Sequence, residues 1–236
     1  MSAGQVSSQQ PGRRLLLPAY HVVDAARYAG VAVGTIRNWQ KARKHFVPAL
    51  AQRELGFSLS FLQLVELRFV AAMRQAGLPI RKIRAAREYL AKAFKVEFPF
   101  ADLRLKSDGQ DIILDLEEEQ GAEFRGKVLI ANKGGQYSWK DVIGSKFAEF
   151  DYEDHLARRW HVAGPDSPIV IDPFIAFGAP QIRGIPTWVL KNRHDGGESS
   201  KEIARDFRLP KKLVQVALAF ENKTTRGKRQ SKAWVH

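Results

Sequence analysis

The pattern of apolar and polar residues predicts two short helices close to the N-terminus. The apolar positions of the first helix are Val22, Val23, Ala25, Ala26 and Ala29. After a turn at Gly30, the buried face of the second is marked by Val33, Ile36 and Trp39. Residues 1–17 lack this periodicity, which is typical of a disordered tail.

Two longer helices are predicted next. Ser60 and Gln63 stand three residues apart at the start of an apolar stripe, which is the spacing of a capping box. Gly77 ends that helix, and Pro79 opens another that runs to about Phe94.

The segment 96–164 loses the helical period. Leu103 and Leu105 precede Asp108-Gly109, and an apolar run at 112–114 follows it, which predicts a hairpin of short strands. Further strands are expected at 128–130 and 158–162, and a helix at 139–147. We interpret this segment as a small α+β module.

The last third returns to helices. A short strand at 169–171 precedes a loop at 174–185 that is punctuated by Gly and Pro. A helix opens at Pro186, and Ser199 and Glu202 again have capping-box spacing. The apolar positions of the final helix are Leu213, Val214, Val216, Ala217 and Phe220.

Charge divides the chain into three parts. The formal net charge of the 236 residues is +13. Residues 1–95 hold 16 Lys+Arg and 4 Asp+Glu, residues 96–164 hold 9 and 14, and residues 165–236 hold 13 and 7. The basic excess at the N-terminal end favours nucleic acid as a partner of that end.

Composition argues against an enzyme. Without Cys there are no disulfides, zinc thiolates or cysteine nucleophiles. The six His lack the spacing of helix or strand metal sites, and the carboxylate runs at 117–119 and 151–154 point in different directions along one element. We therefore expect no catalytic residues, no metal and no cofactor. No apolar run reaches membrane-spanning length and no secretory core is present, so we expect a cytoplasmic protein.

The second predicted helix presents side chains suited to DNA. Opposite its buried face lie residues that can reach bases or phosphates: Thr35, Arg37, Asn38 and Lys41, with Arg43 and Lys44 beyond them. Arg bonds guanine and Asn bonds adenine in the major groove, whereas Lys suits phosphate. We also include Trp39 in the DNA-binding set, although the helical periodicity places it on the buried face with Val33 and Ile36. The alternative is a helix pair used only for protein contact.

Residues 20–39, with Thr35-Ile36-Arg37-Asn38-Trp39, resemble the DNA-binding start of MerR-like winged-helix regulators. The helix pair joined at Gly77-Leu78-Pro79-Ile80 also fits that family. The resemblance implies a winged helix-turn-helix over residues 18–95 that binds DNA as a homodimer. Ala32 replaces the family's usual Ser at the start of the second helix. The thiolates of metal-sensing members are absent.

A second resemblance covers residues 165–221. Asp172-Pro173, Gly178-Ala179-Pro180, Ile182-Arg183-Gly184 and Glu202-Ile203-Ala204 are similar to the signature of VapB-like antitoxins. The resemblance implies an antitoxin paired with a PIN-like ribonuclease toxin. From the residues alone, we expect Ile182 to Gly184 to form a turn, and Arg183 to pair with Asp172. The polar side of residues 199–220 has three alternative partners, which are DNA, a second copy of the chain and a toxin.

The basic tail 222–236 is a candidate toxin contact. Its relevant residues are Arg226, Lys228, Arg229, Lys232 and Trp234. A disordered cationic segment can cover the metal-binding carboxylates of a PIN-type nuclease, since Arg pairs well with carboxylates. A solvated or DNA-contacting tail is the alternative.

The predicted fold is therefore an α-rich α+β chain in five segments. These are a tail at 1–17, a winged helix-turn-helix at 18–95, a small α+β segment at 96–164, a three-helix module with a helix-turn-helix-like pair at 165–221, and a tail at 222–236. The expected function is an antitoxin that silences a toxin and represses its own operon. The alternatives are a MerR-like transcription regulator without a toxin partner and a purely structural interaction module.

Overall fold

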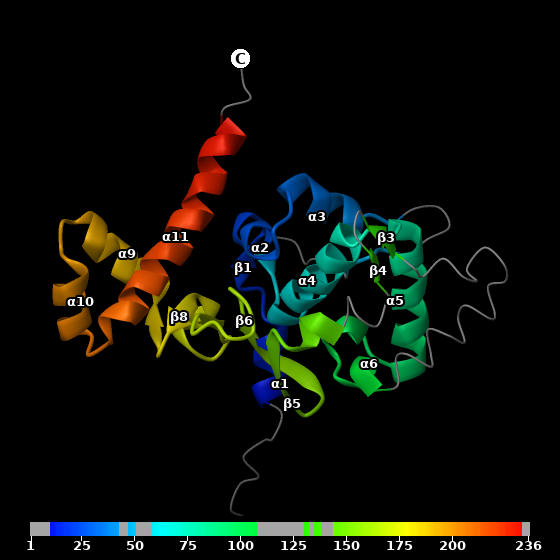
Figure 1. Cartoon of the computed structure of the whole chain (residues 1–236). Coiled ribbons are helices and arrows are strands. Elements are labelled where there is room, and N and C mark those ends of the chain that lie inside the picture. The colour runs from blue at the N-terminus through cyan, green and yellow to red at the C-terminus, as the bar shows by residue number, and fades with distance from the viewer. Residues whose placement is uncertain are drawn as a thin grey trace, which may run out of the picture. The chain divides into compact units, whose positions relative to one another are not determined.

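A computed structural model describes residues 10–42, 47–50, 58–107, 130–132, 135–137 and 144–232, and the chain divides into two compact units, Met1–Arg158 and Arg159–His236 (Figure 1). Each unit is helix-rich with small antiparallel sheets, which confirms the predicted fold class. Within the described residues, no helix has both the length and the apolar character needed to cross a membrane.

The first unit is built around one buried helix. Its main elements are α1 (Gln10–Leu16), β1 (Tyr20–His21), α2 (Val22–Ala29), α3 (Val33–Gln40), β2 (Ser58–Leu59), α4 (Phe61–Gln75) and α5 (Ile80–Phe94). β1 and β2 pair antiparallel with Tyr20 opposite Leu59. Buried side chains lie on every side of α4, since α1, α2, α5 and η1 (Pro99–Ala101) all contact it.

Local signals at the ends of these helices were predicted correctly. At the start of α4, the Ser60 hydroxyl accepts from the Gln63 amide at 3.2 Å, and the Gln63 side chain accepts from the Ser60 amide at 2.9 Å. Gly77 follows the end of α4 with a φ of +96°, a backbone conformation that glycine adopts without strain. Pro79 caps α5.

Three sequence expectations for the first unit differ from the structure. Residues 10–16 form α1, with Leu15 buried, where we expected a disordered tail. The predicted strand at Leu103 and Leu105 is instead a turn and the short helix α6 (Arg104–Ser107). Apolar alternation over so few residues does not distinguish a strand from a helical turn. Residues 112–114 and 128–129 lie outside the described residues.

The end of the first unit contains short strands. They are β3 (Ile130–Asn132), β4 (Gly135–Tyr137), β5 (Phe150–Glu153) and β6 (Leu156–His161), which crosses into the second unit. β3 and β4 form an antiparallel hairpin, and β5 lies beside β6. Residues 144–147 form the described part of the helix that we expected at 139–147.

The second unit combines a small sheet with three helices, of which α9 contacts β8 and β9 while α10 and α11 pack on α9 and on each other. The end of β6 pairs with β7 (Val170–Ile171), β7 with β8 (Pro180–Ile182), and β8 with β9 (Ile185–Pro186), all antiparallel. The helices are α9 (Thr187–Asp195), α10 (Ser200–Asp206) and α11 (Lys211–Lys232). The predicted three-helix module is thus confirmed.

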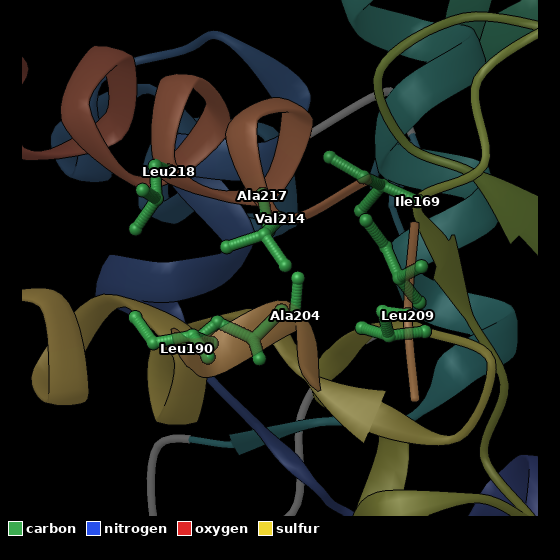
Figure 2. Close-up of a cluster of buried hydrophobic side chains, with 9 residues drawn as sticks. Ile169, Leu190, Ala204, Leu209, Val214, Ala217 and Leu218 are labelled. Atoms are coloured by element: carbon green, nitrogen blue, oxygen red, sulfur yellow. The ribbon is translucent and has the colours of Figure 1, made fainter. Parts of the chain in front are cut away.

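One apolar cluster holds the second unit together (Figure 2). Its buried members are Ile169, Ile182, Leu190, Ile203, Ala204, Leu209, Val214, Ala217 and Leu218. Sheet and helices both contribute, so the helices of this unit depend on packing rather than on propensity.

Two sequence expectations for the second unit need correction. The predicted loop at 174–185 contains η2 (Ala176–Gly178) and the strands β8 and β9, joined by a tight turn at Arg183 and Gly184 with φ of +51° and +83°. This is the turn that we expected at Ile182 to Gly184. The expected disordered tail at 222–236 is wrong for its first part, because α11 continues to Lys232.

Candidate nucleic-acid interface

The helix α3 presents one polar face to solvent and one apolar face to the core. Arg37, Asn38 and Lys41 are exposed, and Thr35 is half-buried. Ile36 is fully buried and Trp39 is 8% exposed. The predicted division of this helix is therefore present, but Trp39 lies with the core and supports the helix rather than facing solvent.

A close approach of α2 fixes the position of α3. Ala25, Ala26 and Ala29 of α2 are buried, and their small side chains let the two helices pack closely. Gly30 ends α2 at a φ of +70°, and its N–H is bonded to carbonyls of the last turn of α2. A turn of this kind, followed at once by α3, gives the helix-turn-helix arrangement.

The two ends of α3 are supported unequally. Its start at Ala32 has no side-chain hydrogen bond, as the absence of Ser there led us to expect. At its end, the Ala49 amide donates to the Trp39 carbonyl at 2.9 Å, and Arg84 Nη2 of α5 donates to the Asn38 carbonyl at 3.5 Å. The buried guanidinium also lies at the negative end of the helix dipole, which favours a cation.

The helix that carries Arg84 is itself held by a buried ion pair. Arg87 Nε of α5 lies 2.7 Å from Glu66 Oε2 of α4, and Glu66 Oε1 accepts from the Phe100 amide at 2.9 Å. Arg87 also donates to the Glu97 carbonyl at 2.7 Å. Burial raises the pKa of Glu66 against the opposing effect of Arg87. These bonds join α4, α5 and η1 into one support behind α3.

The charge on the α3 face is positive. No acidic residue stands in α3, and Asp24 of α2 lies 3.3 Å from Arg27 in an ion pair. Arg43 and Lys44, which we predicted to extend the basic face, lie outside the described residues. What the structure brings together is Arg37, Asn38 and Lys41 on one exposed face.

The second unit contains another helix pair, α10 and α11, with basic residues on its surface. Ser199 and Glu202 form the predicted capping box at α10, with the Ser199 amide bonded to Glu202 Oε2 at 2.8 Å. The exposed cations where α10 meets α11 are Lys201, Arg205, Arg208, Lys211 and Lys212, and Lys223 is exposed further along α11. Arg193 of α9 binds Glu198 and, at 2.7 Å, Asp206, and its guanidinium lies 5.3 Å from the centre of the Phe207 ring.

The expected pairing of Arg183 with Asp172 is replaced by another. Asp172 is buried, and its carboxylate accepts from Arg159 Nε at 2.9 Å and from the Phe174 amide at 2.8 Å. Arg183 is exposed in the β8–β9 turn. Arg159 on β6 was not considered because it lies thirteen positions upstream, beyond any local spacing rule.

Sequence reasoning also missed an exposed apolar group. Phe177 is 88% exposed, Trp188 is 52% exposed, and Ile175 is 37% exposed. Phe177 has a φ of +54°, which is unusual for a bulky residue. In the sequence, the available signal was the aromatic Phe177 next to Gly178. Large exposed aromatics are typical of protein contact surfaces.

The candidate toxin-binding residues are placed only in part. The backbone at Arg226, Lys228, Arg229 and Lys232 is helical within α11, and their side chains lie outside the described residues, as does Trp234 altogether. Among the described residues, no group of three or more His, Asp or Glu is arranged to hold a metal ion.

Two family models match the chain. The model described as "MerR HTH family regulatory protein" matches residues 20–90, and the model described as "Protein of unknown function (DUF433)" matches residues 169–220. These ranges coincide with the two segments that carried the family resemblances in the sequence.

Two curated proteins and one solved structure, all from Mycobacterium tuberculosis, are similar to the chain. "Putative antitoxin VapB45" is 24% identical over 190 residues, covering 72% of this chain and 79% of that protein. "Uncharacterized protein Rv2308" is 25% identical over 219 residues, covering 86% and 90%. The crystal structure of Rv2018 has a TM-score of 0.67 and 23% identity over 86% of this chain and 98% of that chain, which shows a shared fold. The chain thus carries a MerR-family helix-turn-helix domain at its N-terminal end and a DUF433 domain at its C-terminal end.

Proposed function

We propose that this chain is a DNA-binding antitoxin, and not an enzyme, that represses its own operon. In this proposal α3 reads operator DNA, two copies of the chain bind a palindrome, and the C-terminal unit binds and silences a PIN-like ribonuclease toxin. The observation that carries the DNA-binding part is the braced α3 helix, whose exposed face combines Arg37 and Asn38 with Lys41. Arg and Asn are the side chains that read guanine and adenine.

The antitoxin part rests on similarity and on surface chemistry. Over 72% of its length the chain is similar to the protein named "Putative antitoxin VapB45". The C-terminal unit exposes Phe177 and Trp188, which suit burial against a protein partner. The cationic sequence at 226–232 suits the carboxylates of a metal-dependent nuclease.

The DNA-binding proposal is tested with a fragment of the chain's own promoter. We expect Arg37→Ala to weaken specific binding by about 1–3 kcal/mol, while binding to unrelated duplex changes less. Lys92→Ala is the matched control, because it removes an exposed cation of the same unit that is paired with Glu88 at 2.8 Å. Equal promoter binding by Arg37→Ala and the control, or no specific binding by the unaltered chain, would contradict the proposal.

The toxin-binding proposal is tested by co-expression with the adjacent gene. We expect the two products to co-purify and the chain to restore growth. Replacing Arg226, Lys228, Arg229 and Lys232 by Gln should weaken both effects, whereas the double control Lys92→Gln/Lys191→Gln should not. One outcome would favour the second candidate function, a MerR-like regulator without a toxin partner. In that outcome the neighbouring product neither binds the chain nor inhibits growth, while specific promoter binding persists. The match of residues 20–90 to a MerR helix-turn-helix model supports the regulator part of this candidate.

A further inference from the structure

The exposed face of α11 carries cations at its start and no acid over its described side chains. From the start of the helix the exposed residues are Lys211, Lys212, Gln215, Ala219, Asn222 and Lys223. Their spacing of three and four places them along one side of the helix. The acidic residue of this helix, Glu221, is buried, and its Oε1 accepts from the Thr187 hydroxyl at 2.5 Å, so it points away from that side.

Cations of α10 extend this face around the corner between the helices. Lys201 and Arg205 stand one helical turn apart on α10, and Arg208 lies in the turn that leads to α11. The two exposed acids of α10 are already engaged. Glu202 accepts from Ser199 in the capping box, and Asp206 accepts from Arg193 at 2.7 Å. The corner therefore presents five exposed cations, of which Arg205 lies 3.7 Å from Asp206, an acid that also binds Arg193.

Helix stability does not explain the two lysines. Lys211 and Lys212 are the first residues of α11, whose first turn contains no acid. The start of a helix carries partial positive charge, so cations there are unfavourable. In α10 the corresponding turn contains Glu202, which suits this position. Lys211 and Lys212 are therefore unfavourable for the helix itself, and an anionic partner would give these two exposed cations a function.

We propose that the α10–α11 corner is a second DNA-binding surface, which contacts the phosphate backbone of duplex DNA through Lys201, Arg205, Arg208, Lys211 and Lys212. Complementary charge supports this partner, because flexible Lys side chains act as point charges toward phosphate. Beyond these two lysines, the exposed side of α11 carries Gln215, Ala219, Asn222 and Lys223 and no acid. The major groove admits a helix of this size. This surface adds non-specific affinity to the sequence reading proposed for α3.

The test measures the salt dependence of binding by the full chain to a random-sequence duplex. Such a probe requires no operator, so its result does not depend on the function proposed for α3. Between about 50 and 200 mM salt, the slope of log binding constant against log salt reports the number of phosphates neutralised. We expect Lys211→Gln/Lys212→Gln to reduce the steepness of this slope by about 2. The matched control Lys92→Gln/Lys191→Gln also removes two lysines, each paired with an acid within its own helix, and should leave the slope close to that of the unaltered chain.

A second variant separates loss of contact from loss of folding. Lys211→Glu/Lys212→Glu places acids at the start of α11, where they suit the dipole, so its melting temperature should equal or exceed that of the unaltered chain. Its binding to the random duplex should fall further than that of the Gln variant.

Two results would overturn the proposal. One is a slope for Lys211→Gln/Lys212→Gln that matches the control. The other is unchanged DNA binding together with a loss of binding to polyglutamate, which would assign the corner to an acidic protein instead.

Discussion

The helix pairs α2–α3 and α10–α11 share a local plan but differ in where they are supported. In the first pair, the support lies at the end of the second helix, where Ala49 and Arg84 bind its last carbonyls. In the second pair, the support lies at the start of the first helix, in the Ser199 capping box. The exposed face of α3 combines Arg and Asn, whereas the α10–α11 corner exposes mostly Lys. Arg and Asn read base edges and Lys suits phosphate, so this difference agrees with the two roles proposed.

The units behind these helix pairs also differ. Behind α3 lies a buried ion pair between Glu66 and Arg87, with further bonds to backbone groups. Behind α10 and α11 lies an apolar cluster centred on residues such as Leu190 and Val214 (Figure 2). Different substitutions should therefore destabilise each unit.

The largest effect is expected at the buried ion pair. Glu66→Ala leaves the Arg87 guanidinium buried without its carboxylate and removes the acceptor of the Phe100 amide, so we expect a loss of about 3–5 kcal/mol in the free energy of unfolding. Glu88→Ala is the control, since it breaks an exposed pair on α5 and should cost about 0.3–0.5 kcal/mol. Urea unfolding measures both. Equal losses would show that the buried pair does not support this unit.

The same carboxylate predicts a pH dependence. Burial raises the pKa of Glu66 above its usual 4.5, so the folded chain holds this proton more tightly than the unfolded chain. The part of the stability that comes from this proton is therefore fully present below the unfolded pKa and is lost as pH rises through the folded pKa, while the ion pair with Arg87 opposes the loss. Glu66→Gln cannot titrate. We expect urea unfolding to show its stability, relative to the unaltered chain, increasing from pH 4.5 to 7, and a constant difference would contradict the assignment.

The second unit should be most sensitive to loss of apolar volume. Leu190 is fully buried in the cluster, so Leu190→Ala should cost about 2–5 kcal/mol through lost burial and the cavity left behind. Leu16→Ala makes the same change at a side chain that is 49% exposed and should cost much less. Thermal unfolding compares the two variants. A small loss for Leu190→Ala would mean that polar bonds such as Thr187–Glu221 dominate in this unit instead.

A smaller effect is expected at the start of α10. Ser199→Ala removes the acceptor for the Glu202 amide and the hydroxyl that donates to the Glu202 carboxylate, while the backbone amide that also donates there remains, so it should cost about 1 kcal/mol. Ser200→Ala changes the neighbouring serine, which is the first residue of the helix rather than its cap, and serves as control. Hydrogen exchange of the amides of α10 should quicken in the first variant and remain unchanged in the second.

Sequence reasoning succeeded where the physical cause was local. Both capping boxes depend on residues three positions apart, and the β8–β9 turn depends on a glycine and its neighbour, so spacing alone identified them. The buried face of α3 followed from helical periodicity in the same way. Sequence alone therefore placed Arg37, Asn38 and Lys41 correctly on the exposed side and included buried Trp39 in error, whereas DNA binding by these residues stays a prediction.

Sequence reasoning failed where the cause was tertiary. Glu66 and Arg87 lie twenty-one positions apart, and neither spacing nor composition shows that both become buried together. Helix α1 was missed because it is stabilised by packing on α4, with Leu15 buried, and its own sequence does not show that packing. The exposure of Phe177 was missed because an apolar residue is expected to be buried unless the fold shows otherwise.

The smallest expected effect is a gain in stability at the start of α3. It directly tests the comparison of that helix start with the capped start of α10. Ala32 has the extended backbone of an N-cap residue, with φ of −75° and ψ of +147°, but offers no side-chain acceptor. Ala32→Ser should supply one and raise the free energy of unfolding by about 0.5–1 kcal/mol. Ala19→Ser makes the same change at an exposed position that caps no helix and should have little effect. If Ala32→Ser brings no gain in thermal unfolding, the start of α3 is already held by its packing on α2, and the two helix pairs differ less than their caps indicate.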